Sequence, residues 1–225
     1  MFPLRDENPS GSVPFVTLTL IVLNTLVFGY EVMLGGSGLR DLIMTWGLVP
    51  VRLSLALVDR QDLVSPTITL VTSMFLHGGW LHLAGNLWYL WIFGDNIEDL
   101  LGPGRYLVFY LLGGIVAALV HVAVNPASSI PTVGASGAIA AVLGAYALTY
   151  PRARVVTLVP LIFVFQVVAL PALVVLGLWF VFQFFSGALA LSGSMKSSVA
   201  FSAHVGGFLF GVIAVKLFAI GRPRR

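Results

Sequence analysis

A single serine, Ser136, stands between Gly134 and Gly137 in the stretch TVGASGAIAAVLGAY at residues 132–146. The glycine-rich half of this stretch becomes an apolar run of small residues at the serine, which predicts that Ser136 begins a helix. The unpaired N–H groups and the positive dipole end of a helix N-terminus would stabilise an oxyanion. Ser136 is therefore a candidate nucleophile, although serine is also a common N-cap and a G-x-S-G match alone is weak.

A serine nucleophile needs a base, and His204 opens the last apolar run in SAHVGGFLFG. Small residues recur every four positions beside His204 and again beside Ser136, and such stripes let two helices approach closely. We expect the two stripes to face each other and to bring His204 to Ser136. The alternative is that the stripes only pack helices and that His204 makes a structural hydrogen bond. The stripes consist of Gly137, Ala141 and Ala145 in one helix and of Ala203, Gly207 and Gly211 in the other.

His82 and Asn86 lie four residues apart in HLAGNLWYLW and therefore share one helix face. Both side chains can donate to an oxyanion, and polar contacts between membrane helices are the alternative role. His77, His82 and His204 could also bind a metal, but the sequence has no H-E-x-x-H motif and no carboxylate at ligand spacing. We therefore expect no metal. His77 receives no role beyond a place at the membrane interface, and His121 receives none.

The composition places these residues in a membrane protein. Only 9% of the 225 residues are charged, against about 25% in soluble domains, and the mean hydropathy is +0.99. The chain has no cysteine, which excludes disulfides, thiolate metal sites and a cysteine nucleophile. The net charge of +3 comes from scattered or terminal basic residues, so we expect no nucleic-acid partner.

The fold class expected is all-α: a single membrane domain, residues 1–225, with six spanning helices. The first apolar segment is a retained anchor rather than a signal peptide, because no A-x-A-like cleavage site follows it. Pro50 and Arg52 interrupt the apolar part of residues 31–78, which favours a long, partly embedded first loop. A short interfacial segment is expected after residue 155. The expected spans are residues 13–30, 79–94, 106–124, 136–150, 168–188 and 199–218.

The loops and the short fourth span predict the orientation. Most Lys and Arg residues lie in segments that would share one side with both termini, so the positive-inside rule places both termini in the cytoplasm. A helix of about 15 residues rises about 22 Å, which is less than the ~30 Å of hydrocarbon. We therefore expect Ser136 to lie below the opposite surface, in an active site that opens to the outer side.

Three motifs in this order resemble the rhomboid family of intramembrane serine proteases. They are FLHGGWLHLAGNLWYLWIFGDNIED at residues 75–99, GASG at residues 134–137 and AHVGGFLFG at residues 203–211. The combination of H-x-x-x-N, G-x-S-G and A-H-x-x-G is specific, and it covers most of the chain. Glu98 and Gly102 resemble an E-x-x-x-G pair of the family, for which we expect a structural role.

The resemblance implies a catalytic dyad of Ser136 and His204 without an acidic third member. It also implies that His82, Asn86 and the backbone N–H of Ser136 bind the oxyanion, and that Gly134 shapes the turn before the nucleophile. The reaction would be hydrolysis of peptide bonds in or near transmembrane segments of membrane-protein substrates, within the lipid bilayer and without a cofactor. A non-proteolytic rhomboid-like protein that binds membrane clients is the alternative, and a small transporter or channel is a third class.

Two positions depart from the family pattern. Some members carry a Trp-Arg pair in the first loop, whereas here Trp46 is followed by Gly47. Some place an aromatic residue four positions after the serine, against the base, whereas this position is Ala140. If His204 is held by stacking, another residue must supply it. The absence of targeting extensions suggests a bacterial inner membrane.

Overall fold

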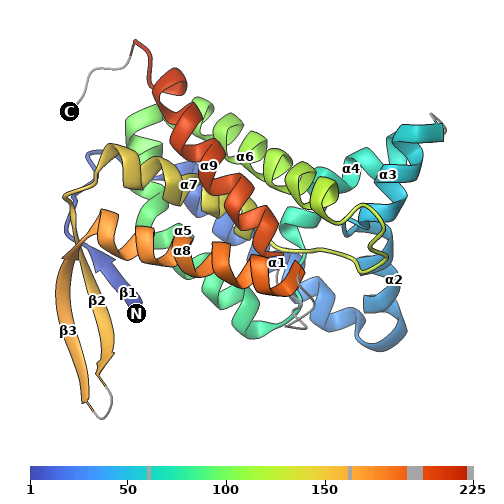
Figure 1. Ribbon diagram of the computed structural model, residues 1–225, viewed down its shortest axis with the longest axis horizontal. Coiled ribbons are helices and arrows are strands. Elements are labelled where there is room, and N and C mark those ends of the chain that lie inside the picture. Colours follow the sequence, from blue (N-terminus) through green and yellow to red (C-terminus); the bar gives the residue numbers. More distant parts are fainter. Residues whose placement is uncertain (60–61, 162–163, 192–199, 222–225) are drawn as a thin grey trace.

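A computed structural model describes residues 1–59, 62–161, 164–191 and 200–221. The protein is a bundle of helices with a small antiparallel sheet at one end (Figure 1). In chain order the elements are β1 (Phe2–Asp6), α1 (Phe15–Leu34), α2 (Gly36–Trp46), α3 (Pro50–Asp59), α4 (Val64–Thr72), the 3₁₀ helix η1 (Ser73–Phe75), α5 (Trp80–Leu101), α6 (Pro103–Val124), α7 (Ser136–Thr149), β2 (Arg154–Leu161), β3 (Val164–Pro171), α8 (Ala172–Leu191) and α9 (Phe201–Phe218).

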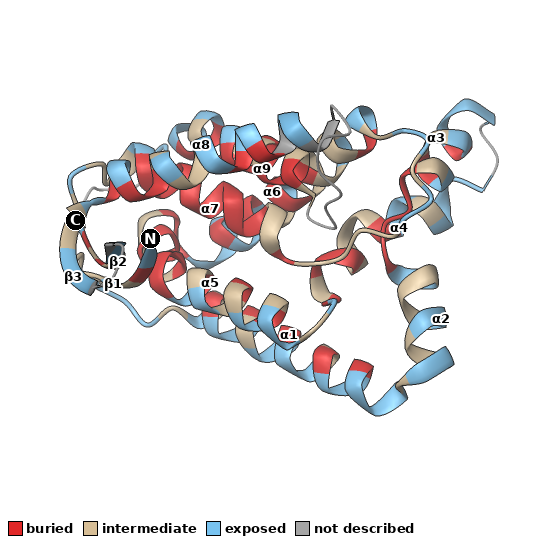
Figure 2. Cartoon of the chain, turned by 60° about the horizontal axis from the view of Figure 1, so that its bottom comes forward, coloured by how far each residue is buried: buried red, intermediate tan, exposed pale blue. Residues whose placement is uncertain are grey.

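Helix α7 lies at the centre of the bundle. Every residue from Ala138 to Ala147 is buried, as expected for a helix that is apolar on all sides. Helices α9, α6 and α5 pack around it, and α8 contacts both α7 and α9. Figure 2 shows that buried residues concentrate on α7 and on the inward faces of its neighbours. The 14 residues of α7 rise only about 21 Å.

The small-residue stripes of α7 and α9 face each other, as predicted. A Cβ atom added to Gly207 would overlap the backbone oxygen of Gly137, and one added to Gly211 would overlap that of Ala141. The two backbones are thus in direct contact along about one turn of helix, which no larger side chain would permit. This contact fixes the position of the first turn of α9 relative to the first turn of α7.

The prediction of a helical membrane bundle is confirmed. By length and composition, α1, α6 and α9 can cross a membrane, and α7 and α8 contribute shorter apolar helices. Helix α5 also packs in the bundle and extends seven residues beyond the predicted end at residue 94. The number of six spans stays a prediction. The predicted sixth span began at residue 199, which lies outside the described residues, and the helix begins at Phe201. Residues 31–78, predicted as one long loop, contain the end of α1 and the short helices α2, α3, α4 and η1.

The segment before the fifth span differs from the prediction. Residues 154–161 and 164–171 form the antiparallel strands β2 and β3 of a hairpin, and β1 pairs with β2 to give the order β1-β2-β3. Helix α8 therefore begins at Ala172 rather than at residue 168. In a continuous apolar run, periodicity does not distinguish a strand from a helix. The sequence therefore did not predict this hairpin.

Glu98 has the structural role expected of it. Its carboxylate is 2% exposed and accepts the backbone N–H groups of Val16 and Thr17, at 2.8 Å each. These donors belong to the first turn of α1, which has no side-chain cap of its own. A carboxylate at a helix N-terminus satisfies unpaired donors and interacts favourably with the helix dipole. Glu98 thereby joins the end of α5 to the start of α1.

Candidate active site

The turn before α7 brings its N-terminus against α5. Gly134 has φ +125°, a conformation that favours glycine, and its backbone N–H donates to the carbonyl of Ser73 at 2.8 Å. A Cβ atom at this position would lie 2.6 Å from His82 Nε2 and 3.5 Å from Asn86 Nδ2. The positive φ of Gly134 and the close approach of these two side chains both require a glycine here.

Ser136 and His204 are in hydrogen-bond contact across the α7–α9 interface. The Oγ atom of half-buried Ser136 lies 2.7 Å from His204 Nε2, within the range expected for a nucleophile and its base. His204 is only 8% exposed. This distance confirms the predicted meeting of the two residues, while their catalytic roles remain predictions.

Two residues of α8 complete the surroundings of His204, and the sequence analysis missed both. Gln183 is 8% exposed, and its Oε1 atom lies 2.7 Å from His204 Nδ1. The ring of Trp179 lies 5.9 Å from the imidazole, at an interplanar angle of 34°. Trp179 thus supplies the aromatic contact that Ala140 cannot. A glutamine in an apolar span is a signal that could have identified Gln183, because polar side chains in membranes seek partners on other helices.

The hydrogen bonds of His204 define its tautomer. If Nδ1–H donates to the Gln183 carbonyl oxygen, Nε2 carries no proton and accepts the Ser136 hydroxyl. His82 has the opposite arrangement: its Nδ1 accepts the backbone N–H of Gly78 at 3.3 Å, which leaves Nε2–H beside the turn at Gly134. One imidazole is thus arranged as an acceptor and the other as a donor.

Asn86 is oriented by a histidine for which the sequence suggested no chemical role. Its Nδ2 atom lies 3.0 Å from His77 Nε2, and His77 Nδ1–H donates to the Phe75 carbonyl at 3.3 Å. The backbone N–H of His77 in turn contacts the two Glu31 carboxylate oxygens at 3.1 and 3.3 Å. Glu31 is 1% exposed, so the end of α1 holds the segment that fixes the Asn86 amide.

His121 ties the approach to α7 to the start of α9. Its Nδ1 lies 2.9 Å from Ser202 Oγ, and its Nε2 lies 3.0 Å from Thr132 Oγ1. Thr132 also pairs with Leu48 of the first loop through two backbone hydrogen bonds of 2.7 and 3.0 Å. This pairing anchors the first loop without a Trp-Arg pair. A cavity of about 380 Å³ lies among α2, α3 and α4, and Ser136 does not line it.

The three histidines considered as metal ligands make other contacts in the structure. His77 and His82 lie edge to face with ring centroids 5.2 Å apart, and His204 pairs with Ser136. Within the described residues, no three His, Asp, Glu or Cys side chains come together in a way that could hold a metal ion.

The Rhomboid domain family matches residues 65–220. The chain belongs to the rhomboid family. A presenilin-associated rhomboid-like protein A, mitochondrial, of Danio rerio is 35% identical over 64% of this chain and 36% of its own length. Rhomboid protein 1, mitochondrial, of Saccharomyces cerevisiae is 28% identical over 68% of this chain and 42% of its own length. Rhomboid protease GluP of Bacillus subtilis is 32% identical over 59% of this chain and 24% of its own length. The matches thus span less than half of each relative.

These comparisons contradict the expectation of a bacterial inner membrane. The relatives from Danio rerio and Saccharomyces cerevisiae are named as mitochondrial proteins, and so are those from Bos taurus and Homo sapiens. The bacterial assignment is therefore withdrawn. The expectation rested on the lack of a targeting extension, which says nothing about compartment when a rhomboid chain matches only part of each relative.

Proposed function

We propose that this rhomboid is an intramembrane serine protease that hydrolyses peptide bonds in or near the transmembrane segments of membrane proteins. The observation that carries the proposal is the 2.7 Å contact between Ser136 Oγ and His204 Nε2 at the N-terminus of the buried helix α7. Family membership and the name of the Bacillus subtilis relative, a rhomboid protease, support the same class of reaction.

In the proposed mechanism His204 Nε2 takes the hydroxyl proton as Ser136 Oγ attacks the carbonyl carbon of the substrate. A tetrahedral intermediate forms, and its oxyanion accepts hydrogen bonds from His82 Nε2–H, Asn86 Nδ2–H and the backbone N–H of Ser136. His204 then protonates the leaving amine, which yields an acyl-enzyme on Ser136. Water activated by the same imidazole hydrolyses the ester and regenerates the hydroxyl.

Gln183 acts in this scheme as a positioning residue. Its carbonyl oxygen holds the proton on His204 Nδ1, so that Nε2 stays available to the serine, and it stabilises the imidazolium that forms during attack. An ionised carboxylate has this role in many soluble serine proteases. A buried amide orients the ring without placing a net charge inside a membrane bundle, where an unpaired charge is costly.

The substrate must present an unwound backbone. A membrane-spanning helix has its carbonyls hydrogen-bonded internally, so helix-breaking residues near the cleaved bond should promote cleavage. The glycine and alanine residues beside Ser136 favour small side chains at that bond. The single-domain assignment of residues 1–225 and the side of the membrane to which the site opens remain predictions.

The decisive experiment is labelling with a serine-directed fluorophosphonate, with Ser136→Ala as the matched control. We expect the purified protein to be labelled and to cleave a transmembrane reporter, and the Ser136→Ala and His204→Ala variants to do neither. Equal labelling of the Ser136→Ala variant would exclude Ser136 as the nucleophile. Binding of the reporter without labelling or cleavage would favour the client-binding alternative.

A further inference from the structure

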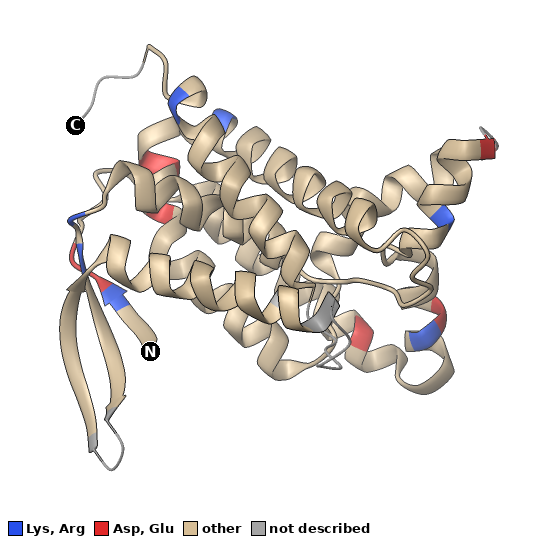
Figure 3. Cartoon of the chain, in the orientation of Figure 1, with Lys and Arg blue, Asp and Glu red and all other residues tan. Residues whose placement is uncertain are grey.

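The β2–β3 hairpin presents an unusually apolar surface outside the helical bundle. Between residues 155 and 171 the sequence contains no charged residue. Phe165 is 72% exposed and Val167 is 61% exposed. Figure 3 shows no charged residue on the described parts of β2 and β3 beyond a basic residue at the root of the hairpin. In water such a hairpin would be a site of aggregation, because it combines exposed apolar side chains with a free strand edge.

Strand β1 joins the sheet to the side of helix α5. The Trp88 indole Nε1–H donates to the carbonyl of Pro3 at 2.7 Å, and the Phe2 ring stacks on Trp88 at 5.5 Å. At the other end of β1, Asn96 Nδ2 donates to Asp6 Oδ2 at 3.0 Å. Trp88 and Asn96 are eight residues apart, or about 12 Å along a helix. Both ends of strand β1 therefore contact α5.

Exposed apolar side chains continue along the chain from the hairpin into α8. Strand β3 ends at Pro171 and α8 begins at the next residue. Leu173 is 55% exposed and Phe182 is 66% exposed on that helix. In Figure 1 the hairpin extends across the direction of α8, at the end of the bundle where β1 ends and α8 begins. A hairpin in this orientation would lie along a membrane surface rather than through it.

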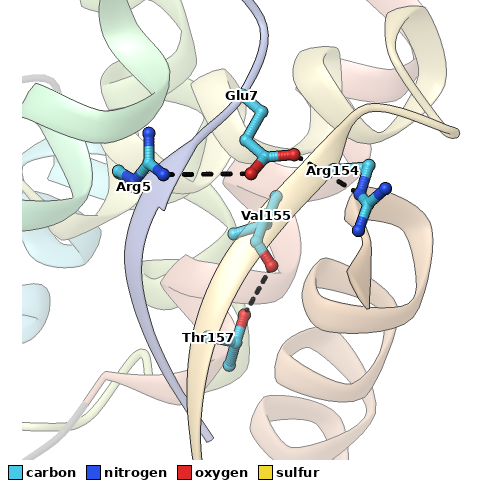
Figure 4. A network of polar contacts seen from close by, with 5 residues as sticks. All are labelled: Arg5, Glu7, Arg154, Val155 and Thr157. Carbon is cyan, nitrogen blue, oxygen red and sulfur yellow. Dashed lines mark hydrogen bonds and ion pairs between the residues drawn. The ribbon is translucent and has the colours of Figure 1, made fainter. Parts of the chain in front are cut away.

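The backbone and the charges define the depth at which the hairpin can lie. Strand β3 is an edge of the sheet, and its outward N–H and C=O groups have no ladder partner, which excludes the hydrocarbon core. The root of the hairpin is basic: Arg154 contacts Glu7 at 3.3 Å, and Arg5 contacts the same carboxylate at 3.9 Å (Figure 4). The exposed side chain of Arg152 adds a further positive charge. Apolar side chains, unpaired backbone groups and nearby basic residues together fit the headgroup–acyl boundary.

We propose that the β2–β3 hairpin lies in the lipid interface on the side of the bundle that holds β1 and acts as a lateral membrane anchor. Phospholipid is its partner: the acyl region receives Phe165 and Val167, and headgroups satisfy the outer edge of β3. The phosphates lie near Arg152 and Arg154. This role is independent of proteolysis, because it concerns the placement of the bundle in the bilayer.

The absence of cysteine from the sequence makes the test direct. A nitroxide is attached to Phe165→Cys in the full chain reconstituted in phosphatidylcholine–phosphatidylglycerol vesicles, and its collision rates with oxygen and with a water-soluble nickel chelate are measured. Phe182→Cys on α8 is the lipid-exposed control, and Glu7→Cys, at the exposed residue that follows β1, is the polar control. Thermal unfolding of each variant checks that it is folded.

We expect the Phe165 label to collide with oxygen at least severalfold more often, relative to nickel, than the Glu7 label, and its depth to lie between those of the two controls. A ratio equal to that of the Glu7 label would place the hairpin in water and overturn the proposal. Spin–spin broadening that disappears on dilution with unlabelled protein would instead identify a second copy of the chain as the partner, and would also overturn it.

Discussion

Replacement of Gln183 by methionine tests the contact that the sequence did not predict. Methionine has a similar length, but its sulfur is only a weak acceptor and cannot replace the carbonyl oxygen Oε1 of Gln183, which lies 2.7 Å from His204 Nδ1. Both residues are 8% exposed, so water cannot readily replace the lost hydrogen bond. During serine attack the imidazole becomes charged, and a hydrogen bond to a charged group contributes about 1.5–3 kcal/mol.

At about 1.4 kcal/mol per tenfold change in rate, loss of this bond should lower kcat by roughly 10- to 150-fold. KM should change little, because Gln183 contacts the ring nitrogen that faces away from Ser136. The assay is steady-state cleavage of a transmembrane reporter in proteoliposomes, together with the rate of fluorophosphonate labelling. Phe182→Met is the matched control, since it introduces the same side chain at the neighbouring, 66% exposed position of α8.

The Gln183→Glu variant separates positioning from packing. A glutamate restores the acceptor and, when ionised, favours the imidazolium form of His204. Activity should therefore return at high pH, and the acidic limb of the kcat/KM profile should move to higher pH. A Gln183→Met variant with kcat within twofold of the parent would refute the positioning role. An equal loss in both variants, accompanied by lower thermal stability, would show that Gln183 only packs α8 against α9.

Gly207→Ala should lower activity about 10²-fold, because separating the α7 and α9 backbones by about 1 Å misplaces the base. Gly29→Ala is the control, since its added Cβ meets nothing within 4 Å. Unchanged cleavage by the Gly207→Ala variant would contradict the packing argument. His77→Leu should lower kcat by up to about 10²-fold with little change in KM, since Asn86 loses the partner that orients its amide. A change in KM alone would refute the role of His77 in orienting Asn86. Burial raises the pKa of Asp6 from 3.8 to about 6, so folding takes up a proton in this range and the protein should lose stability as pH rises from about 4 to about 6. In Asp6→Asn this pH dependence of the melting temperature should shrink, and an unchanged profile would contradict the assignment.

The sequence predicts the helices and the contact between Ser136 and His204 because both depend on local signals. A polar-to-apolar boundary at Ser136 and small residues every four positions determine which helices can touch, and the backbone contact of Gly207 with Gly137 follows. The contacts of Gln183 and His77 depend on how α8 and the segment before α5 are placed in space, which no single motif encodes. The strands β2 and β3 were not predicted for a related reason. Their apolar sequence is equally compatible with a strand, an interfacial segment and part of a spanning helix.

The arrangement of helices around His204 separates two requirements of the proposed chemistry. The distance from Nε2 to Ser136 is determined by glycine contacts between α7 and α9, which are buried and have no room for adjustment. The protonation of Nδ1 is determined by Gln183 on α8, a helix with a largely exposed outer face. A rigid contact therefore defines where the nucleophile and base meet, and a more peripheral helix defines which tautomer the base adopts. It follows that a change which shifts α8 while leaving α7 and α9 in place should lower the rate without breaking the Ser136–His204 contact. A change within the α7–α9 interface should abolish that contact itself.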